Sequence, residues 1–306
     1  MTAPLAVTKG HGTQNDFVLL DDRDGVMDLD ADLVRALTDR RAGIGADGVL
    51  RLVGSGRLEA GAAALAEDPA ATWFMDYRNA DGSVAEMCGN GVRVLAAFAE
   101  RLGVWDGTGE LILGTRAGVR RVRRVTGPPA AATWYAVDMG VWSLPRADRA
   151  VADGADAEVT VPGLAVPRPG LSVDVGNPHT VLALPGVDEL DAADLTTAPR
   201  VLPVPPAGTN VELVVPLGER RTDDGVVGAV RMRVHERGVG ETRSCGTGAC
   251  AAALAVRTWA GAGAPDVWQV EVPGGVVRVT VSGDRVELAG PAVLVADAVV
   301  DLEALR

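Results

Sequence analysis

The chain has 306 residues, of which 47% are hydrophobic and 23% charged, and its formal net charge is −12. This length suits one large domain or two of ordinary size, and the composition is that of a folded globular protein. The acidic balance argues against nucleic acid or an anionic membrane surface as a partner. We find no apolar run of about 18 residues that could span a membrane and no N-terminal signal segment. Three cysteines do not suit a disulfide framework, so we expect a cytoplasmic protein.

Lys9 is the only lysine in the chain. Pyridoxal-phosphate enzymes hold their cofactor on a lysine, and Lys9 lies at the end of an expected strand without a phosphate-binding loop nearby. No close pair of Cys and His residues repeats along the sequence, which argues against a zinc site. We therefore expect neither a cofactor nor a metal.

The first half of the chain alternates expected strands with polar turns, one of which carries His11 and Asn15. Asp30 is predicted to cap a helix. The Gly-rich run 43–48 matches G-x-G-x-x-G, but a dinucleotide site needs a strand before the motif and a helix after it, and here the order is reversed. We predict a loop there and a surface excursion over 54–72. Strands are predicted at 5–9, 17–21, 49–53, 73–78, 110–113 and 119–123.

The second half begins after a Gly- and Pro-rich linker at 127–132. This linker places the domain boundary between 1–130 and 131–290, and segment 291–306 is expected to return to the first domain. Segment 148–163 is predicted to be a loop, and His179 is placed in a loop after a strand. Segment 134–139 opens this half and 292–300 is its last segment. Strands are predicted at 171–175, 180–184, 230–237, 267–272, 276–281 and 286–288.

Two similar stretches organise the sequence. Cys88 precedes Gly-Asn-Gly and Cys245 precedes Gly-Thr-Gly, and each stretch continues into residues that favour a helix. The glycines then fall in the first turn, where backbone N–H groups lack intrahelical partners. A cysteine at this position is biased toward its thiolate, and an anion can bind beside it. The repeat predicts a pseudo-twofold pair of facing α+β domains, each supplying one thiol to a single carbon acid.

Six blocks, in this order, resemble the diaminopimelate epimerase family of cofactor-independent enzymes in lysine and peptidoglycan-precursor synthesis. The resemblance covers nearly the whole chain, and its blocks lie at 11–17, 43–48, 79–91, 176–179, 208–212 and 236–248. It implies an isomerase that epimerises LL-2,6-diaminopimelate to the meso isomer with two thiols. It also implies two pseudo-symmetric domains, each a mixed barrel-like sheet around a central helix.

The resemblance also implies roles for individual residues. Cys88 and Cys245 would be the two acid/base groups, with His179 and Glu236 beside them and Glu236 also touching the substrate. The distal amino-carboxylate end of the substrate would be held by Asn15, Asn79, Asn177, Asn210 and Arg237. The reacting carboxylate would bind the N–H groups of Gly89, Asn90, Gly246 and Thr247. Some family members carry a substrate-contacting Gln where this chain has Gly48, so a contact there would come from the backbone or be missing.

Other functions remain open at this point. The alternatives are a related racemase for proline, hydroxyproline or histidine, and a non-racemising isomerase of the phenazine-biosynthesis type. Proline racemase-like enzymes typically have Gly-His-Gly after the first cysteine, and the phenazine group lacks the cysteine pair. A thiol hydrolase could use His179 but would not explain two equivalent cysteines. Cys250 is expected to be a buried spectator. The substrate, diaminopimelate, is the expected partner, and a homodimer is left open.

Overall fold

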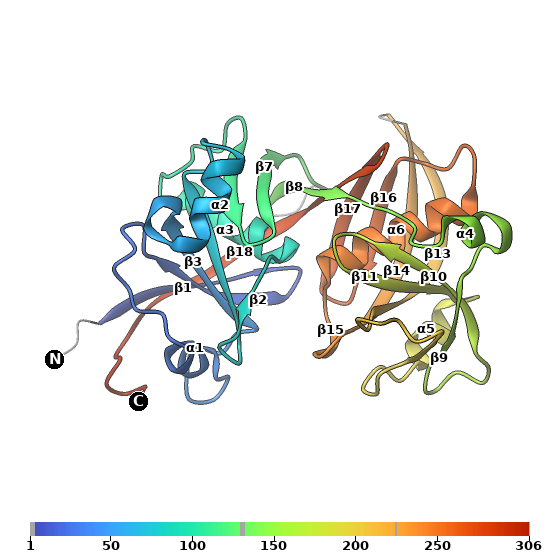
Figure 1. The fold of residues 1–306 in the computed structure, drawn as a ribbon, viewed down its shortest axis with the longest axis horizontal. Coiled ribbons are helices and arrows are strands. Elements are labelled where there is room, and N and C mark those ends of the chain that lie inside the picture. The colour runs from blue at the N-terminus through green and yellow to red at the C-terminus, as the bar shows by residue number, and fades with distance from the viewer. Residues whose placement is uncertain (1–3, 129–131, 224, 306) are drawn as a thin grey trace. The chain divides into compact units, whose positions relative to one another are not determined.

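The structure, a computed structural model, describes residues 4–128, 132–223 and 225–305 (Figure 1). Its contacts divide the chain into two compact units. Unit 1 contains the described residues up to Val137 together with those from Gly290 onward, and unit 2 is Asp138–Ala289. The boundary predicted after residue 130 lies within 129–131, outside the described residues.

The strands of unit 1 form a closed ring of eight, because each pairs with the next and the last pairs with the first. In ring order they are β1 (Leu5–Gly12), β2 (Asn15–Asp21), β3 (Gly48–Gly54), β4 (Trp73–Asn79), β6 (Leu111–Thr115), β7 (Gly118–Val125), β8 (Thr133–Val141) and β18 (Arg285–Val300). The β2–β3 and β4–β6 pairs are parallel, and β1–β2 and β3–β4 are antiparallel. The expected mixed barrel is confirmed.

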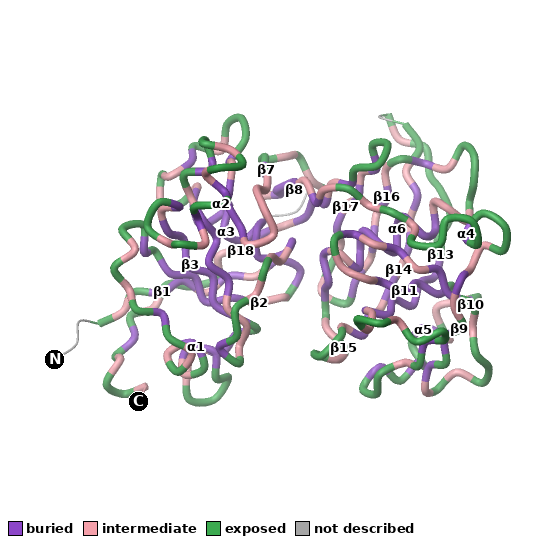
Figure 2. The backbone as a smooth tube through the Cα atoms, in the orientation of Figure 1, coloured by how far each residue is buried: buried purple, intermediate pink, exposed green. Residues whose placement is uncertain are grey.

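Helix α3 (Gly89–Arg101) is the central helix of unit 1, and it contacts β1, β2, β3, β4 and β7. All residues from Gly89 to Ala99 are buried, and Figure 2 shows buried backbone concentrated in the strands and central helix of each unit. A helix buried on every side is expected to be mostly apolar or small. The Gly- and Ala-rich sequence after Cys88 meets this demand except at the buried polar residues Asn90 and Arg93, and the helix predicted there is confirmed.

Shorter helices and one short strand complete unit 1. Helix α1 (Ala31–Thr38) begins at the predicted cap Asp30, whose side chain accepts a 2.7 Å hydrogen bond from the N–H of Leu33. The segment 54–72 is largely exposed, as expected for a surface excursion, and it forms η1 (Ser55–Arg57) and α2 (Glu59–Glu67), in which only Gly61 and Ala64 are buried among the α2 residues. An Ala-rich helix with a narrow buried face has no strong apolar period to reveal it. The short β5 (Val84–Ala85) leads into Cys88.

In unit 2, seven strands pair in succession around helix α6 (Gly246–Ala260). They are β10 (Arg168–Asp174), β11 (Pro178–Ala183), β13 (Asn210–Thr222), β14 (Gly225–Glu236), β16 (Val267–Val272), β17 (Gly275–Ser282) and the first part of β18. The helix contacts the first six of these and is buried along most of its length. The second predicted helix is therefore also confirmed.

The segment expected as a loop over 148–163 contains α4 (Ala147–Asp153) and β9 (Ala157–Thr160), so that prediction was wrong. The strand is only four residues long, too short for a periodic signal, and it is held by pairing with β10 and with β12 (Arg200–Leu202). Helix α5 (Val187–Ala192) and β15 (Gly240–Thr242) complete the unit.

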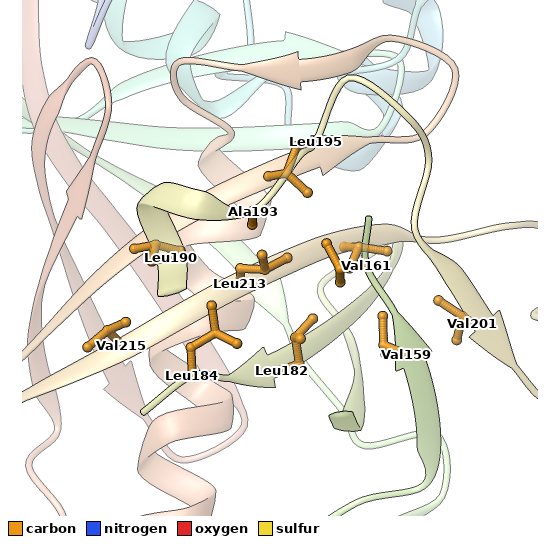
Figure 3. Close-up of a cluster of buried hydrophobic side chains, with 11 residues drawn as sticks. Val159, Val161, Leu182, Leu184, Leu190, Ala193, Leu195, Val201, Leu213 and Val215 are labelled. Atoms are coloured by element: carbon orange, nitrogen blue, oxygen red, sulfur yellow. The ribbon is translucent and has the colours of Figure 1, made fainter. Parts of the chain in front are cut away.

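An apolar cluster packs β9 and α5 against β11 and β13 (Figure 3). On β13 the cluster takes alternate residues, Val211, Leu213 and Val215. Since side chains alternate between the two faces of a strand, Glu212 projects from the opposite face, which α6 contacts. The outer packing thus fixes which β13 side chains reach the central helix.

Strand β18 runs without interruption for 16 residues, whereas the sequence interpretation had separated a short strand at 286–288 from a last segment at 292–300. Gly290 and Pro291 in the middle suggested a break. The first part of the strand pairs with β17 in unit 2 and the last part with β1 in unit 1. One strand therefore serves both units.

Candidate active site

Each central helix begins directly after a cysteine. Cys88 is the N-cap of α3 and Cys245 the N-cap of α6, and both have extended backbones. The Cys88 sulfur accepts a hydrogen bond from the N–H of Gly91 at 3.4 Å, and the Cys245 sulfur accepts one from Gly248 at 3.3 Å. Each thiol thus lies at the positive end of a helix, as the two motifs predicted.

In unit 1, a β1–β2 hairpin brings Asn15 to Cys88. The two turn residues, Thr13 and Gln14, have φ of 49° and 64°, the left-handed values that a two-residue hairpin of type I′ requires. Asn15 then opens β2, and its Oδ1 accepts from the Cys88 thiol at 3.6 Å and from Nδ2 of Asn90 at 3.2 Å. The predicted residues Asn15, Asn90 and Cys88 are therefore in contact.

The other end of the Asn15 amide meets a charged cluster. Its Nδ2 donates to Oδ2 of Asp47 at 2.7 Å. Arg40 bridges Asp47 and Asp16, and Lys9 pairs with Asp16 at 2.6 Å. Burial alone would raise the pKa of Asp16, but hydrogen bonds from Arg40 and Lys9 hold that pKa well below its usual value. The single lysine is thus an ion-pair partner in this cluster.

Two other predicted positions of unit 1 are placed differently. The Nδ2 of Asn79 donates to Oγ of Ser83 at 3.0 Å, within its own turn. A Cβ on Gly48 would lie 2.5 Å from the backbone oxygen of Arg78. No side chain fits at Gly48 without a backbone shift, so the Gln of other family members has no equivalent position there.

In unit 2, a hydrogen-bond path leads from the Cys245 sulfur to His179. Thr247 Oγ1 is 3.5 Å from the sulfur and accepts from Asn177 Nδ2 at 3.4 Å. Asn177 Oδ1 is 3.0 Å from Nε2 of His179. The structure therefore connects three predicted residues, Asn177, His179 and Thr247, to the second thiol.

His179 is not in a loop, as the sequence suggested, but is the second residue of β11, and only 1% of it is exposed. Its Nδ1 lies 2.7 Å from Oε1 of Glu212, which is fully buried. The sequence interpretation missed Glu212. Its signal was a lone acid in the apolar run Val211–Val215, since a charged group is rarely buried without a partner.

Glu236 ends β14 and lies two residues beyond Val234, the cross-strand partner of Glu212. Residues two positions apart on a strand lie on the same face of the sheet, so Glu212 and Glu236 both point toward α6. Thr242 donates a hydrogen bond to Glu236, and the Cys245 thiol also hydrogen bonds to it. Burial raises the pKa of Glu236.

The electrostatics of Cys245 differ from the expectation of a thiolate at a helix end. Burial, together with the nearby carboxylates of Glu236 and Glu212, raises the pKa of the Cys245 thiol well above its usual value. These effects outweigh the opposing hydrogen bonds from Thr247 and Gly248. Cys245 thus rests as a proton donor, because the negative charges around it disfavour a second anion.

Asn210 and Arg237, the remaining predicted binding residues of unit 2, form hydrogen bonds within the protein. Asn210 accepts from the N–H of Arg237 at 3.0 Å and donates to the carbonyl of Pro178 at 3.1 Å. The Arg237 guanidinium donates to the carbonyl of Ala207. Both side chains therefore tie loops together. Cys250 is fully buried in α6, as expected.

Residues 4–128, 132–223 and 225–305 contain neither a metal-binding cluster nor a membrane-spanning helix. No group of three or more His, Cys, Asp or Glu side chains there is arranged to hold a metal ion. None of the helices in those ranges has both the length and the apolar character needed to cross a membrane.

Solved structures of low identity share this fold. A protein described as a predicted epimerase from Pseudomonas aeruginosa has a TM-score of 0.63 at 15% identity, covering 97% of this chain and 99% of that one. A hydroxyproline epimerase from Agrobacterium vitis has a TM-score of 0.60 at 15% identity, covering 100% and 93%. A phenazine biosynthesis protein from Bacillus anthracis has a TM-score of 0.60 at 13% identity, covering 98% and 99%. The chain therefore has the fold of the cofactor-independent epimerases and their phenazine-biosynthesis relatives.

Sequence comparison narrows this class. The diaminopimelate epimerase profile matches residues 7–141 and 171–295. Proteins named diaminopimelate epimerase are 49% identical in Rhodococcus jostii, over 96% of both chains, and 46% identical in Thermobifida fusca, over 99% of this chain and 100% of that one. The one from Streptomyces coelicolor is 43% identical, over 97% and 96%. The chain belongs to the diaminopimelate epimerase family and is an isomerase.

Proposed function

We propose that this enzyme interconverts LL- and meso-2,6-diaminopimelate, a step of lysine and peptidoglycan-precursor synthesis, with Cys88 and Cys245 as its two proton-transfer groups. The observation that carries the proposal is the pair of cysteine N-caps, each with its sulfur bound by a first-turn N–H. Its support in sequence is the 49% identity to a protein named diaminopimelate epimerase.

Inverting a stereocentre requires that a proton leaves one face of the carbon and another arrives at the opposite face. In one direction the Cys88 thiolate takes the α-proton while the Cys245 thiol donates its own, and in the other direction the roles reverse. No proton is gained or lost overall. The negative charge that develops passes into the substrate carboxylate, where first-turn N–H groups of Gly89, Asn90, Gly246 and Thr247 stabilise it.

The neighbours of Cys245 suit a group that must both give and take a proton. Glu236 receives a hydrogen bond from the thiol, and burial raises the pKa of its carboxyl. It can therefore accept the Cys245 proton when this cysteine acts as the base. His179 and Asn177 hold the Thr247 hydroxyl against the sulfur.

The distal amino-carboxylate of the substrate is assigned to Asn15, Asn79, Asn177, Asn210 and Arg237. An arginine provides a planar fork for a carboxylate, and amides can bind both an ammonium and a carboxylate. Binding this remote end fixes the α-carbon relative to the thiols.

The test is exchange of the α-proton for deuterium, followed with LL- and meso-diaminopimelate and, for comparison, with proline and histidine. Exchange with both diaminopimelate isomers is expected, and a lack of exchange with either would overturn the proposal. Cys88→Ser and Cys245→Ser should each abolish two-way epimerisation. Cys250→Ser is the matched control, because it changes a thiol of the helix that Cys245 caps, about one turn from the helix start.

We further infer a cytoplasmic location. Cys88, Cys245 and Cys250 are all present as thiols, which suits a reducing compartment. Cell fractionation with an antibody to the protein tests this, and recovery outside the cytoplasm would contradict it.

A further inference from the structure

Four side chains in unit 1 form a hydrogen-bond chain, with a group that can only donate at one end and a group that can only accept at the other. Arg93, on α3 and fully buried, donates from a terminal guanidinium nitrogen to Oδ1 of Asn90 at 2.9 Å. Asn90 donates from Nδ2 to Oδ1 of Asn15 at 3.2 Å. Asn15 donates from Nδ2 to the Asp47 carboxylate at 2.7 Å.

The chemistry of the two ends determines how both amides are turned. A guanidinium can only donate, so the Asn90 oxygen must face Arg93 and its NH₂ must face Asn15. An ionised carboxylate can only accept, so the NH₂ of Asn15 must face Asp47 and its oxygen must face Asn90. The two requirements agree at the Asn90–Asn15 contact. The direction of the chain therefore follows from its end groups and does not depend on telling nitrogen from oxygen in an amide.

The same direction decides what Cys88 meets. The oxygen of Asn15 that accepts from Asn90 also lies 3.6 Å from the Cys88 sulfur. An amide oxygen accepts a hydrogen bond from a thiol but repels a thiolate. A reversed Asn15 would instead offer its NH₂, which favours the thiolate.

We propose that Asp47 and Arg93 are positioning residues that hold Asn15 with its oxygen toward Cys88, so that this cysteine keeps a hydrogen-bond acceptor for its proton. The role rests on the proposed function, in which Cys88 must carry a proton in one direction of the reaction. Neither residue was assigned a function from the sequence.

Other charged and titratable groups lie near this hydrogen-bond chain. Their effect on Cys88 must be distinguished from the effect of the direction of the hydrogen bonds. On β1 and β2 they are His11, whose Nδ1 accepts from the N–H of Gln14, and Lys9 and Asp16. Arg40 pairs with both Asp16 and Asp47. On the approach to α3, Glu86 lies two residues before Cys88. Removing the charge of Asp47 thus changes both the local field and the chain's direction.

The deciding experiment compares Asp47→Asn with Asp16→Asn, since both acids pair with Arg40 but only Asp47 holds Asn15. The readout is the pH dependence of Cys88 alkylation by iodoacetamide, followed on its peptide by mass spectrometry. Asp47→Asn replaces the acceptor-only end by an amide that can turn either way, so only the Asn90 end still constrains Asn15, and the midpoint should fall by up to about one pH unit more than in Asp16→Asn. Asp47→Glu, which again only accepts, should return the midpoint toward wild type. Equal shifts in Asp47→Asn and Asp16→Asn would overturn the proposal.

The other end of the chain is tested by activity. Arg93→Lys keeps a donor-only group and should retain α-proton exchange to within about threefold, whereas Arg93→Gln can turn either way and should lose about tenfold or more. Equal activity in the two variants would contradict the assigned role of Arg93. The alkylation experiment needs no substrate, so it still decides the inference if wild-type enzyme fails to exchange the α-proton of diaminopimelate.

Discussion

The carboxylate of Glu212 lies 2.7 Å from Nδ1 of His179, and both side chains are fully buried. Burial raises the pKa of Glu212, against the opposing charge of His179 and its hydrogen bond. With Nδ1 occupied in this way, Nε2 of His179 faces Asn177. Glu212 thus orients the histidine that begins the path to Cys245.

Glu212→Gln is expected to lower kcat at least about tenfold, which corresponds to about 1.4 kcal/mol of barrier, with little change in KM. The amide keeps the size of the acid but cannot share a proton with His179 in the same way. Steady-state kinetics in both directions measure the effect. Glu219→Gln, on an exposed part of the same strand, is the control and should match wild type. A normal kcat in Glu212→Gln would show that the pair is not needed.

Gly248→Ala should inactivate the enzyme, whereas the equivalent Gly91→Ala should be mild. A Cβ at Gly248 would lie 2.8 Å from Oε1 of Glu212 and 3.2 Å from the Cys245 sulfur. At Gly91 the nearest such contact is Cδ2 of Leu50 at 3.2 Å, which can shift. We expect a loss of about a hundredfold or more in kcat/KM for Gly248→Ala and less than about tenfold for Gly91→Ala. Similar losses in the two variants would contradict this difference between the half-sites.

Asp76→Asn should cost about 3–5 kcal/mol of the free energy of unfolding, measured by urea denaturation at neutral pH. Asp76 is fully buried and forms ion pairs with Arg51 at 2.6 Å and Arg116 at 2.7 Å, and a third with Arg78. Its loss would leave buried cations uncompensated. Asp266→Asn, which breaks an exposed pair with Arg257, should cost about 1 kcal/mol or less. A small cost for Asp76→Asn would mean that the arginines find other partners.

Asp76 also predicts how the free energy of unfolding changes at low pH. Burial would raise the pKa of Asp76, but hydrogen bonds and charges from the arginines hold the pKa below its usual value. A group whose pKa is lowered on folding stabilises the protein above its unfolded pKa, and that contribution is lost as pH falls through the folded value. In wild type the stability should therefore drop below about pH 4, and Asp76→Asn should flatten this limb.

The Cys245 thiol predicts how the free energy of unfolding changes at alkaline pH. Its pKa is raised on folding by burial and by the carboxylates of Glu236 and Glu212. The stability that this raised pKa contributes is fully present below the unfolded pKa of about 8.5 and is lost as pH rises toward the folded value. Cys245→Ala should therefore show a flatter decline above about pH 8.5 than wild type. Urea denaturation over an alkaline pH series measures both slopes, and parallel slopes would contradict the assignment.

Much of the site could be predicted because its key residues carry local signals. A cysteine before Gly-x-Gly and an alanine-rich run predicts a capped helix from propensity alone. Asp30 was found as a cap in the same way. The family resemblance supplied the barrel, which no local pattern could reveal, because ring closure depends on pairing β1 with a strand almost 300 residues later in the chain.

What the sequence missed depends on side-chain direction and on packing. Glu212 reaches His179 only because Val211 and Leu213 pack on the outer face of β13. Burial, and after it the carboxylates of Glu236 and Glu212, raises the pKa of the Cys245 thiol, whereas the helix end alone favours the thiolate. Asp47 lies in the Gly-rich run 43–48, which was predicted only as a loop, and Arg93 lies in the helix predicted after Cys88. Neither prediction indicated a role for the side chain.

Strand β18 follows the other strands of unit 1 in the chain, and unit 1 needs it to join β8 to β1. The first barrel is therefore synthesised early but cannot close until residues 285–300 have been translated. Until then β1 and β8 present open backbone edges, which are sites for aberrant pairing between chains. A nascent chain stalled before residue 285 should thus depend on chaperones, and a C-terminal truncation should harm the N-terminal half of the protein first.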